Sequence, residues 1–389
     1  MHIVPAQVSV LQHVRFKYAC RHCERHALIS PIITSPMPAQ PIPGNIASAS
    51  TVATILTAKY ADGLPLYRME SVLERNDVDI RRGTMGRWVI RSSEDWLERL
   101  YKAMRQTLLR QHIIHGDETP VQVLKEVGRT AQSSSTMWVY RSAADSVQPV
   151  VLFDYQPGRG HAHPERFLDG YSGAIMTDGY AAWRMLKGVI HLGCMAHVRH
   201  RFDEALKAQK HPNGRARQAL DTIGKLYQIE KKARGKPPDG ETPEQYTYRL
   251  RQEHSRGVLH TRYAWLVKHQ QEVLPQSLIG KAIGDVLGQW KYVIRYIDDG
   301  CAPIDNNVIE RDIRPFAIGR KAWLFADTVA WATVSAIVDS IMLTCRACNV
   351  QPYRYLRHVL TELPLRSVDA DITDLLPFNF QPPAAPTSA

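Results

Sequence analysis

The 389-residue sequence has no continuous apolar run near the roughly 18–20 residues that a membrane-spanning helix requires. It also lacks the apolar segment of a signal peptide after Met1. It contains 6 cysteines, which we expect to be reduced thiols in a chain without a secretion signal. These absences argue against a membrane protein and a disulfide-stabilised secreted protein, and they favour a protein of the cytoplasm.

Acidic residues are fewer than basic ones. The chain has 38 Asp and Glu against 49 Lys and Arg, a formal net charge of +11. Excess positive charge concerns partners rather than fold, and nucleic acid is the commonest polyanion that such a surface meets. The hydrophobic fraction of 44% and the charged fraction of 22% are those of a globular protein. Charge alone therefore leaves two classes open, a nucleic-acid-binding protein and an ordinary basic enzyme.

Composition and periodicity divide the first third of the chain into three parts. Residues 1–29 are basic and rich in His, and residues 30–49 are rich in Pro, Ser and Ala, as in a linker. Residues 50–111 have apolar positions at three-to-four spacing, which predicts helices. Within them, residues 79–88 could form the turn and second helix of a helix-turn-helix, with a plain helical hairpin as the alternative.

Short apolar runs bounded by Gly, Pro, Ser or Asp predict an α/β core from residue 112 to 208. Residues 209–300 are polar and mostly helical, and residues 301–350 include a predicted long helix at 330–349. Residues 351–389 form a C-terminal segment whose Pro- and Ala-rich tail, from 381, is expected to be disordered. The predicted strands are Ile113–Leu124, Thr136–Tyr140, Val150–Phe153, Ala174–Thr177 and Ile190–Leu192.

Asp117 and Asp178 occupy similar places in this predicted core. Each comes shortly after an apolar run, Ile113–Ile114 before one and Ala174–Met176 before the other. A buried carboxylate is costly unless it is paired, and two on neighbouring strands would repel unless a divalent cation lies between them. Mg²⁺ prefers carboxylate oxygens and keeps its remaining sites for water and phosphate. The alternative is that both residues only form turns at strand ends.

A third carboxylate, Glu310, lies in a polar segment. On a helix, Asn306, Asn307, Glu310 and Arg314 share a face at three-to-four spacing. Without a metal, Asn307 could cap the helix with Glu310 at the third position, and Glu310 could pair with Arg314. Pro315 disfavours helical conformation at the residue before it, which predicts that this helix ends near Arg314.

Several blocks in order carry a resemblance to transposases of the insertion sequence 66 family, a bacterial group of the DDE class. The similarity runs from about residue 4 to 377, and blocks of this length in this order are very specific. The blocks are His115–Val121, Phe153–Tyr171, Thr177–Ala181, Gly193–Arg199, Ile304–Pro315 and Gly319–Ala326.

The resemblance implies an α/β fold with an RNase-H-like catalytic core. That core would comprise residues 112–208 and 301–350, with a long α-helical insertion at 209–300. A mainly helical domain at 50–111 would precede it, and residues 1–29 would be the remnant of a zinc-ribbon-like DNA-binding module. The gap of 132 residues between Asp178 and Glu310 is long enough for such an insertion.

The resemblance also implies a site and its chemistry. Asp117, Asp178 and Glu310 would bind two Mg²⁺ or Mn²⁺ ions, roughly 3.5–4 Å apart, for cleavage at transposon ends and strand transfer. No covalent enzyme intermediate is needed. The implied partners are terminal inverted repeats, target DNA, further copies of the chain as a homo-oligomer on DNA, and accessory proteins of the same element. The implied location is the bacterial cytoplasm, at the nucleoid.

Other residues of these blocks suit supporting roles. Asn306 and Asn307 would shape the start of the helix that carries Glu310. Cys194 and His197 are one helical turn apart, and we expect a structural role near the site, because a metal site would need two more ligands. The candidate contacts to DNA phosphates, with solvated or ion-paired surface charge as the alternative, are Arg311, Arg314, Arg320 and Lys321.

The N-terminus departs from the family pattern. Relatives usually have two Cys-x-x-Cys knuckles, and this sequence has one, at Cys20 and Cys23. A structural Zn²⁺ prefers four ligands, so these thiols are half of a zinc site, which His22 or His26 could supplement. We expect a free arm instead. Two other functions therefore stay open: an RNase-H-like nuclease without strand transfer, and an inactive remnant that only binds DNA.

Overall fold

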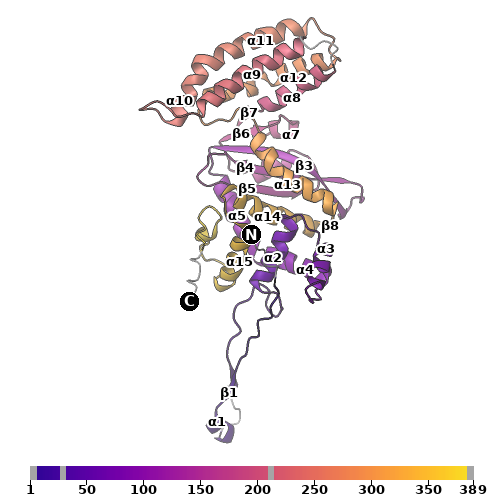
Figure 1. The fold of residues 1–389 in the computed structure, drawn as a ribbon, viewed down its shortest axis with the longest axis vertical. Coiled ribbons are helices and arrows are strands. Elements are labelled where there is room, and N and C mark those ends of the chain that lie inside the picture. Colours follow the sequence, from indigo (N-terminus) through magenta and orange to yellow (C-terminus); the bar gives the residue numbers. More distant parts are fainter. Residues whose placement is uncertain (1–6, 27–31, 209–213, 383–389) are drawn as a thin grey trace, which may run out of the picture.

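The computed structural model describes residues 7–26, 32–208 and 214–382 (Figure 1). Its centre is a six-stranded sheet in the order β5-β4-β3-β6-β7, with β8 paired to the far end of β3. The strands are β3 (Ile113–Lys125), β4 (Ser134–Ser142), β5 (Val151–Gln156), β6 (Ala174–Thr177), β7 (Ile190–Gly193) and β8 (Ala326–Thr328).

Strand direction identifies the architecture. β4 is antiparallel to both β3 and β5, whereas β3, β6 and β7 run parallel to one another. Short helices connect the later strands: α6 (Ala162–Phe167) precedes β6, and α7 (Ala181–Arg184) precedes β7. This is an α/β fold with an RNase-H-like core, as predicted, and each predicted strand is present within a few residues of its expected bounds.

Helices pack beneath the sheet, at the opposite end of the molecule from the insertion (Figure 1). The helix α4 buries Met85, Trp88 and Val89 and exposes Arg82, Arg87 and Arg91, so its solvent face is basic. A DNA-binding role for α3 and α4 stays a prediction. The helices of this group are α2 (Ala49–Tyr60), α3 (Leu66–Glu74), α4 (Arg82–Ser92), α5 (Glu98–Leu108), α14 (Val329–Ala347) and α15 (Pro352–Glu362), with single turns at Ser93–Leu97, Leu363–Leu365 and Thr373–Leu375.

The helix α14 has the length and mean hydropathy of a membrane span, although polar residues interrupt its apolar sequence. It is nevertheless a core helix, because 72% of its apolar window is buried inside the protein. Two of its hydroxyls also satisfy the edge strand β5. Phe153 N–H donates to Ser340 Oγ (2.8 Å) and Val151 N–H to Thr344 Oγ1 (3.0 Å). Covering an edge in this way prevents pairing with another chain.

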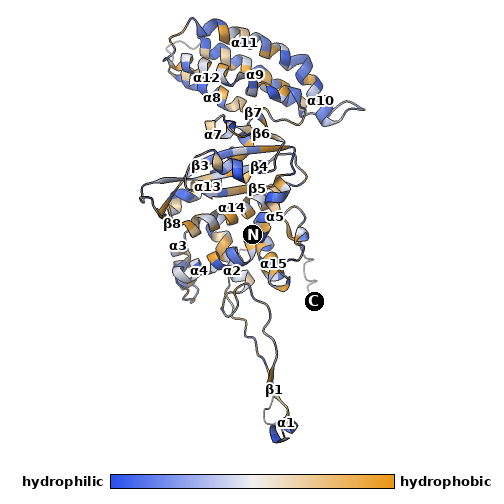
Figure 2. Cartoon of the chain, turned by 180° about the vertical axis from the view of Figure 1, so that it is seen from behind, coloured by the Kyte–Doolittle hydropathy of each residue, from blue (hydrophilic) through white to orange (hydrophobic). Residues whose placement is uncertain are grey.

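The segment between β7 and the last core helices forms a helical layer at the other end of the molecule (Figure 1). Figure 2 shows hydrophilic and hydrophobic stretches mixed along its helices. They enclose an apolar cluster that includes Phe202, Ile223, Leu266 and Ile283. The helices are α8 (Met195–Lys207), α9 (Arg215–Ala233), α10 (Pro243–Leu250), α11 (Arg256–Gln270) and α12 (Leu278–Val293), with turns at Arg251–Ser255 and Arg295–Asp298.

A buried ion pair fixes this helical layer internally and to the chain that returns to the core. Arg251 donates to the Glu230 carboxylate through Nε at 2.9 Å and through Nη2 at 2.6 Å, and the two side chains are 3% and 6% exposed. The same guanidinium donates to the carbonyls of Tyr296 (2.8 Å) and Asp299 (2.6 Å). One side chain therefore joins α9 to the segment that leads back toward α13 (Asn307–Trp323).

We expect Glu230→Ala to lower the free energy of unfolding by about 3–5 kcal/mol, because it leaves the Arg251 charge buried and unpaired. Urea denaturation followed by circular dichroism measures the loss. The matched control is the double variant Glu230→Leu/Arg251→Met, which removes both charges and is expected to recover most of the stability. Equal stability of Glu230→Ala and the unmodified protein would contradict this account.

A second buried acid gives a pH-dependent prediction. Burial raises the pKa of Asp154 on β5 to about 6, against the opposing effects of a hydrogen bond from Gln156 and the charges of Arg166 and Arg105. In the unfolded chain this carboxyl ionises near pH 3.9. As the pH rises from about 4 to about 6, the unfolded state loses its proton first, so this group lowers folded-state stability across that window.

Asp154→Asn cannot ionise, so the difference in unfolding free energy between the variant and the unmodified protein should increase with pH. We expect an increase of about 3 kcal/mol in favour of the variant between pH 4 and pH 6.5, and no further change above. Paired urea titrations at several pH values measure it. A difference that is independent of pH would show that Asp154 ionises normally.

The N-terminal segment projects from the body as a hairpin of β1 (Lys17–Ala19) and β2 (Ile32–Thr34), with α1 (Arg21–His26) at its tip (Figure 1). Of the tail that was predicted to be disordered, residues 383–389 lie outside the described residues.

Candidate active site

The sheet places Asp117 and Asp178 side by side. Asp117 lies within β3, and Asp178 directly follows the last residue of β6. In this parallel pair Ile113 lies opposite Ala174, an offset of 174 − 113 = 61 residues, and 178 − 117 is also 61. Continuing the register therefore puts Asp178 opposite Asp117. Because side chains alternate along a strand and neighbouring strands lie about 4.8 Å apart, both carboxylates emerge on one face of the sheet.

The electrostatics of Asp117 are those of a crowded carboxylate site. Burial, together with the negative charges of Glu118, Asp178 and Glu310, raises the pKa of Asp117 to about 8 against a hydrogen bond from Glu118 N–H. A group of acids that cannot all ionise in water-excluded surroundings is stabilised by a cation. The donor set of hard oxygens fits Mg²⁺ or Mn²⁺.

Glu310 reaches the same face of the sheet from the first turn of α13 (Asn307–Trp323). This helix packs on the sheet through Ile309 and Phe316, which join the buried cluster around Val121 and Val139. The Glu310 carboxylate is turned toward α8, where its Oε1 lies 3.7 Å from His197 Nδ1. Sequence-predicted residues of the three carboxylate blocks therefore converge, but Glu310 is oriented toward another neighbour.

Asn306 is the residue that connects these segments. It is fully buried, its Oδ1 lies 2.7 Å from His115 Nδ1, and its Nδ2 donates to Gly116 O at 3.0 Å. Its backbone N–H donates to Cys194 Sγ at 3.2 Å. Burial lowers the pKa of His115 to about 4, so the ring is neutral and its Nδ1–H donates to the amide oxygen. Asn306 thus fixes the start of α13 against the two residues before Asp117 and against the start of α8.

The structure corrects the predicted start of this helix. Asn306 is the N-cap residue and Asn307 is the first residue of the helix, and Asn307 N–H donates to Asp305 Oδ1 at 3.1 Å. The ion pair between Glu310 and Arg314, which belonged to the alternative without a metal, does not occur among the described residues. Asn306 and Glu310 are turned toward residues of other segments, whereas Asn307 is held by its neighbour Asp305.

The predicted end of this helix was also wrong. α13 continues through Pro315 to Trp323. Pro315 removes one helical hydrogen bond, but Ile309 on one side and Phe316 on the other are both buried in the same cluster. Tertiary packing on both sides of the proline therefore outweighs the local preference. Trp323 is half-buried against Phe316, with ring centroids 5.7 Å apart.

Glu118 is a residue of the site that sequence reasoning missed. Its side chain is 3% exposed, accepts from Trp183 Nε1 at 2.7 Å and pairs with Arg159. The Arg159 guanidinium lies over the Tyr180 ring, 4.0 Å from its centroid, and Tyr180 N–H donates to Asp178 Oδ1 at 2.8 Å. A continuous chain of contacts therefore supports both aspartates from behind. A carboxylate directly beside Asp117 was the available signal.

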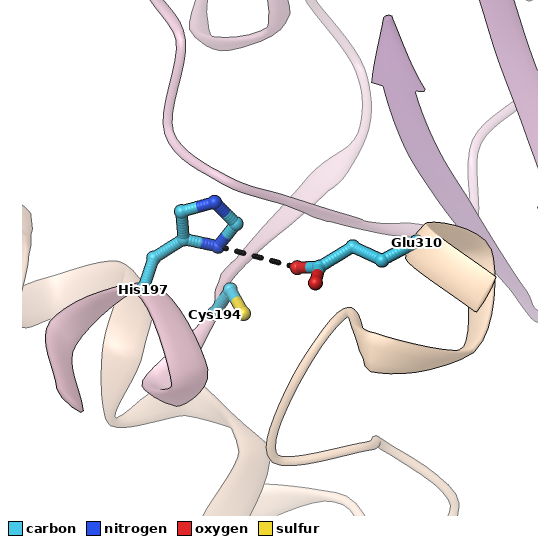
Figure 3. A group of neighbouring side chains, drawn as sticks. All are labelled: Cys194, His197 and Glu310. Carbon is cyan, nitrogen blue, oxygen red and sulfur yellow. Dashed lines mark ion pairs between the residues drawn. The ribbon is translucent and has the colours of Figure 1, made fainter. Parts of the chain in front are cut away.

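Cys194 and His197 lie at the start of α8, facing Glu310 (Figure 3). Their ligand atoms and a Glu310 carboxylate oxygen all lie within 4.8 Å of one another, and Asp117 and Asp178 are not part of this group. Burial raises the pKa of the Cys194 thiol to about 12, despite hydrogen bonds from backbone N–H groups. The role of Cys194 and His197 as a structural pair near the site stays a prediction. Glu310 lies close enough to both to supply a third ligand.

A pocket of about 660 Å³ opens beside Glu310, between the helices α8 and α9 and the start of α13. It combines basic and acidic groups: Arg199 and His200 line it from α8, together with Asp203. The remaining lining residues are Ala196, His197, Gly224, Tyr227, Asn307 and Glu310.

The four predicted phosphate contacts differ in their surroundings. Arg311, Arg314 and Lys321 are exposed, and no ion pair occupies them in the part of the chain that the structure describes. Arg320 is instead half-buried and donates to Thr119 Oγ1 (3.2 Å) and to the Pro120 carbonyl. Arg320 therefore fastens α13 to β3. The ion pair of Asp312 with Arg141, at 2.5 Å, fastens the same helix to β4.

Cys20 and Cys23 lie next to and within α1, exposed and half-buried respectively. Hydrogen bonds from Cys23 and from the His22 backbone lower the pKa of the Cys20 thiol. The described residues bring no group of three metal ligands together here. A zinc role for these two thiols stays a prediction.

Comparison with known families now bears on the carboxylate face. The family model described as "Transposase IS66 family" matches residues 44–333. The chain belongs to the IS66 transposase family. Two further models match the flanks: the IS66 C-terminal element at 340–378 and the zinc-finger binding domain of transposase IS66 at 1–24. The family implies a protein that acts on DNA.

Relatives of this IS66-family chain include two proteins of Sinorhizobium fredii, both named as uncharacterized. Protein y4jD is 28% identical over 395 residues, which cover 97% of this chain and 74% of the relative. Protein y4qI is 29% identical over 399 residues, which cover 98% of this chain and 70% of the relative. The similarity thus extends over nearly the whole chain, including the N-terminal zinc-finger region.

Proposed function

We propose that this chain is a DDE-type transposase that binds the ends of an insertion sequence and catalyses metal-dependent cleavage and strand transfer. The observation that carries the proposal is the shared register of Asp117 and Asp178, with Glu310 near enough for its charge to affect Asp117. Membership of the IS66 family supports it. The bacterial cytoplasm, at the nucleoid, is the proposed location.

Asp117, Asp178 and Glu310 would hold two Mg²⁺ or Mn²⁺ ions. When bound, these ions would activate the attacking hydroxyl and stabilise the leaving 3′ oxygen. The protein's part is to hold and orient the three carboxylates, and the bound cations would favour their ionised forms. Asp178 is oriented by Tyr180 N–H, and Asp117 by the N–H of Glu118. Glu310 would turn from His197 toward the two aspartates.

The DNA partners would be terminal inverted repeats and target DNA. Arg311, Arg314 and Lys321 are free to contact phosphates on the exposed side of α13, next to the carboxylates. Arg320 would act indirectly, by holding this helix on β3. A homo-oligomer on paired ends, and accessory proteins of the same element, belong to the proposal as implied by the family.

The proposal is tested with DNA duplexes that carry the element's own terminal repeats. We expect the purified chain to cleave at the repeat end and to join that end to a target plasmid in Mg²⁺, with both products absent in EDTA. Cleavage without joining would support an RNase-H-like nuclease instead. Repeat-specific binding without cleavage, in either Mg²⁺ or Mn²⁺, would support an inactive DNA-binding remnant and overturn the proposal.

A further inference from the structure

The ligand atoms of Cys194, His197 and Glu310 meet in a group of their own, beside the two aspartates (Figure 3). The Cys194 thiol is buried, at 2% exposure. His197 Nδ1 is shielded from solvent and has no hydrogen-bond partner among the described residues, although Glu310 Oε1 lies 3.7 Å away. A shielded ring nitrogen that faces a thiol and a carboxylate can serve as a metal ligand.

The chemistry of this set differs from that of the aspartates. One sulfur, one imidazole nitrogen and one carboxylate oxygen suit Zn²⁺ and other thiophilic divalent ions, whereas Mg²⁺ prefers oxygen only. Three protein ligands with a fourth position for water or substrate are typical of an open zinc site. Zinc bonds of about 2.0–2.3 Å place tetrahedral ligands roughly 3.5 Å apart, so the group, within 4.8 Å, needs only a small contraction.

The backbone around the group is fixed and would support a metal-bound thiolate. Cys194 is the N-cap residue of α8, a helix of 13 residues, and the positive end of a helix stabilises a negative sulfur. Asn306 N–H donates to Cys194 Sγ at 3.2 Å, the kind of contact that supports a metal-bound thiolate. Met195 N–H donates to Ile304 O at 3.0 Å, which fastens the element carrying Cys194 and His197 to the segment before Glu310.

We infer that Cys194, His197 and Glu310 form a second metal site, which binds Zn²⁺ or a similar thiophilic ion and competes with the two aspartates for Glu310. The first part of this inference rests on the geometry of the three residues. The second part rests on the proposed function, because one carboxylate cannot be directed toward both sites. Zinc would therefore inhibit the Mg²⁺-dependent reaction by holding Glu310 in the orientation shown in Figure 3.

Cobalt spectroscopy tests the site without reference to activity. The background is Cys20→Ala/Cys23→Ala, which removes the N-terminal thiols. Titration with Co²⁺ should give one ion per chain, with a thiolate-to-cobalt charge-transfer band and the intense visible bands of a tetrahedral ion, and Zn²⁺ should displace it. His197→Ala should weaken Co²⁺ binding by at least about tenfold, and Cys194→Ser should abolish the charge-transfer band.

The controls separate this site from its neighbours. His200→Ala removes a nearby histidine that lines the same pocket and should leave Co²⁺ affinity unchanged. Asp117→Asn should also leave the cobalt spectrum unchanged. His197 is 43% exposed at its side chain, so its variant should fold even if a substitution at the buried Cys194 does not. Absence of a charge-transfer band in the background protein would overturn the site. So would a band in both His197→Ala and Cys194→Ser that equals the band of the background protein.

Inhibition is measured as cleavage with added Zn²⁺ relative to each variant's own cleavage in Mg²⁺ alone. The ratio should fall at least about tenfold in the background protein and change little in His197→Ala. A zinc effect that is equal in both would overturn the competition. If no variant cleaves DNA but the cobalt bands appear, the metal site stands and the proposed transposase activity fails. If cleavage occurs without any cobalt bands, the proposed transposase activity stands and the second metal site fails.

Discussion

Asp117→Asn should reduce cleavage and strand transfer by at least about 10³-fold, because each carboxylate of a two-metal site contributes several kcal/mol of transition-state stabilisation. The substitution preserves shape and replaces a buried, raised-pKa carboxyl by a neutral amide, so the variant should fold at least as well as the unmodified protein. Product formation on labelled repeat-end DNA in Mg²⁺ measures the loss, and repeat-end binding should persist.

The matched control is Asp154→Asn. Asp154 is also a buried acid of the sheet with a raised pKa, but it pairs in register with Trp138, which lies opposite Glu118 rather than Asp117. Its side chain therefore projects from the other face, and its substitution should change the rate by less than about threefold. Equal losses in both variants would indicate a general effect of removing a buried charge, and joining that persists in Asp117→Asn would remove Asp117 from the catalytic site.

The second large effect is expected at Asn306, which we assign as a positioning residue for Glu310. Asn306→Ala removes the contacts to His115 and Gly116 and frees the start of α13 relative to the strand of Asp117. A displacement of about 1 Å at a catalytic group can reduce a rate about 100-fold. The same change leaves a buried N–H and a buried carbonyl unpaired, which should lower stability by about 2–4 kcal/mol.

The Mg²⁺ dependence of the strand-transfer rate distinguishes positioning from simple loss of structure. The strand-transfer rate should be determined below the thermal transition of the variant, as a function of Mg²⁺ concentration. A displaced Glu310 should raise the Mg²⁺ concentration for half-maximal rate, whereas partial unfolding would lower the maximal rate without changing that concentration. Asn307→Ala is the matched control, because Asn307 is exposed and contacts only its neighbour Asp305 in the described residues. An unchanged Mg²⁺ requirement in Asn306→Ala would contradict the assignment.

The sequence by itself determined the strands, the two aspartates and the family. Alternating and apolar runs predicted β3 to β7, because a strand that is buried on one or both faces needs apolar side chains at those positions. The equal placement of Asp117 and Asp178 after apolar runs was readable without a fold. Their separation of 61 residues is also the strand register, although the sequence offered no means of recognising it as such.

Tertiary structure decided the surroundings of Glu310. Local rules offered a cap at Asn307 with an ion pair from Glu310 to Arg314 as one alternative, and they predicted a stop at Pro315. The structure has none of these, because Asn306 and Glu310 are turned toward distant segments and the helix is packed on both sides of Pro315. His115, Cys194 and His197 lie more than 100 residues before the helix that they contact. A proline inside a helix costs about 3 kcal/mol, whereas burial of Ile309 and Phe316 contributes about 1.5–3 kcal/mol for each side chain, so that the two together can offset it. Packing therefore sets the length of α13, and with it the direction in which Glu310 points.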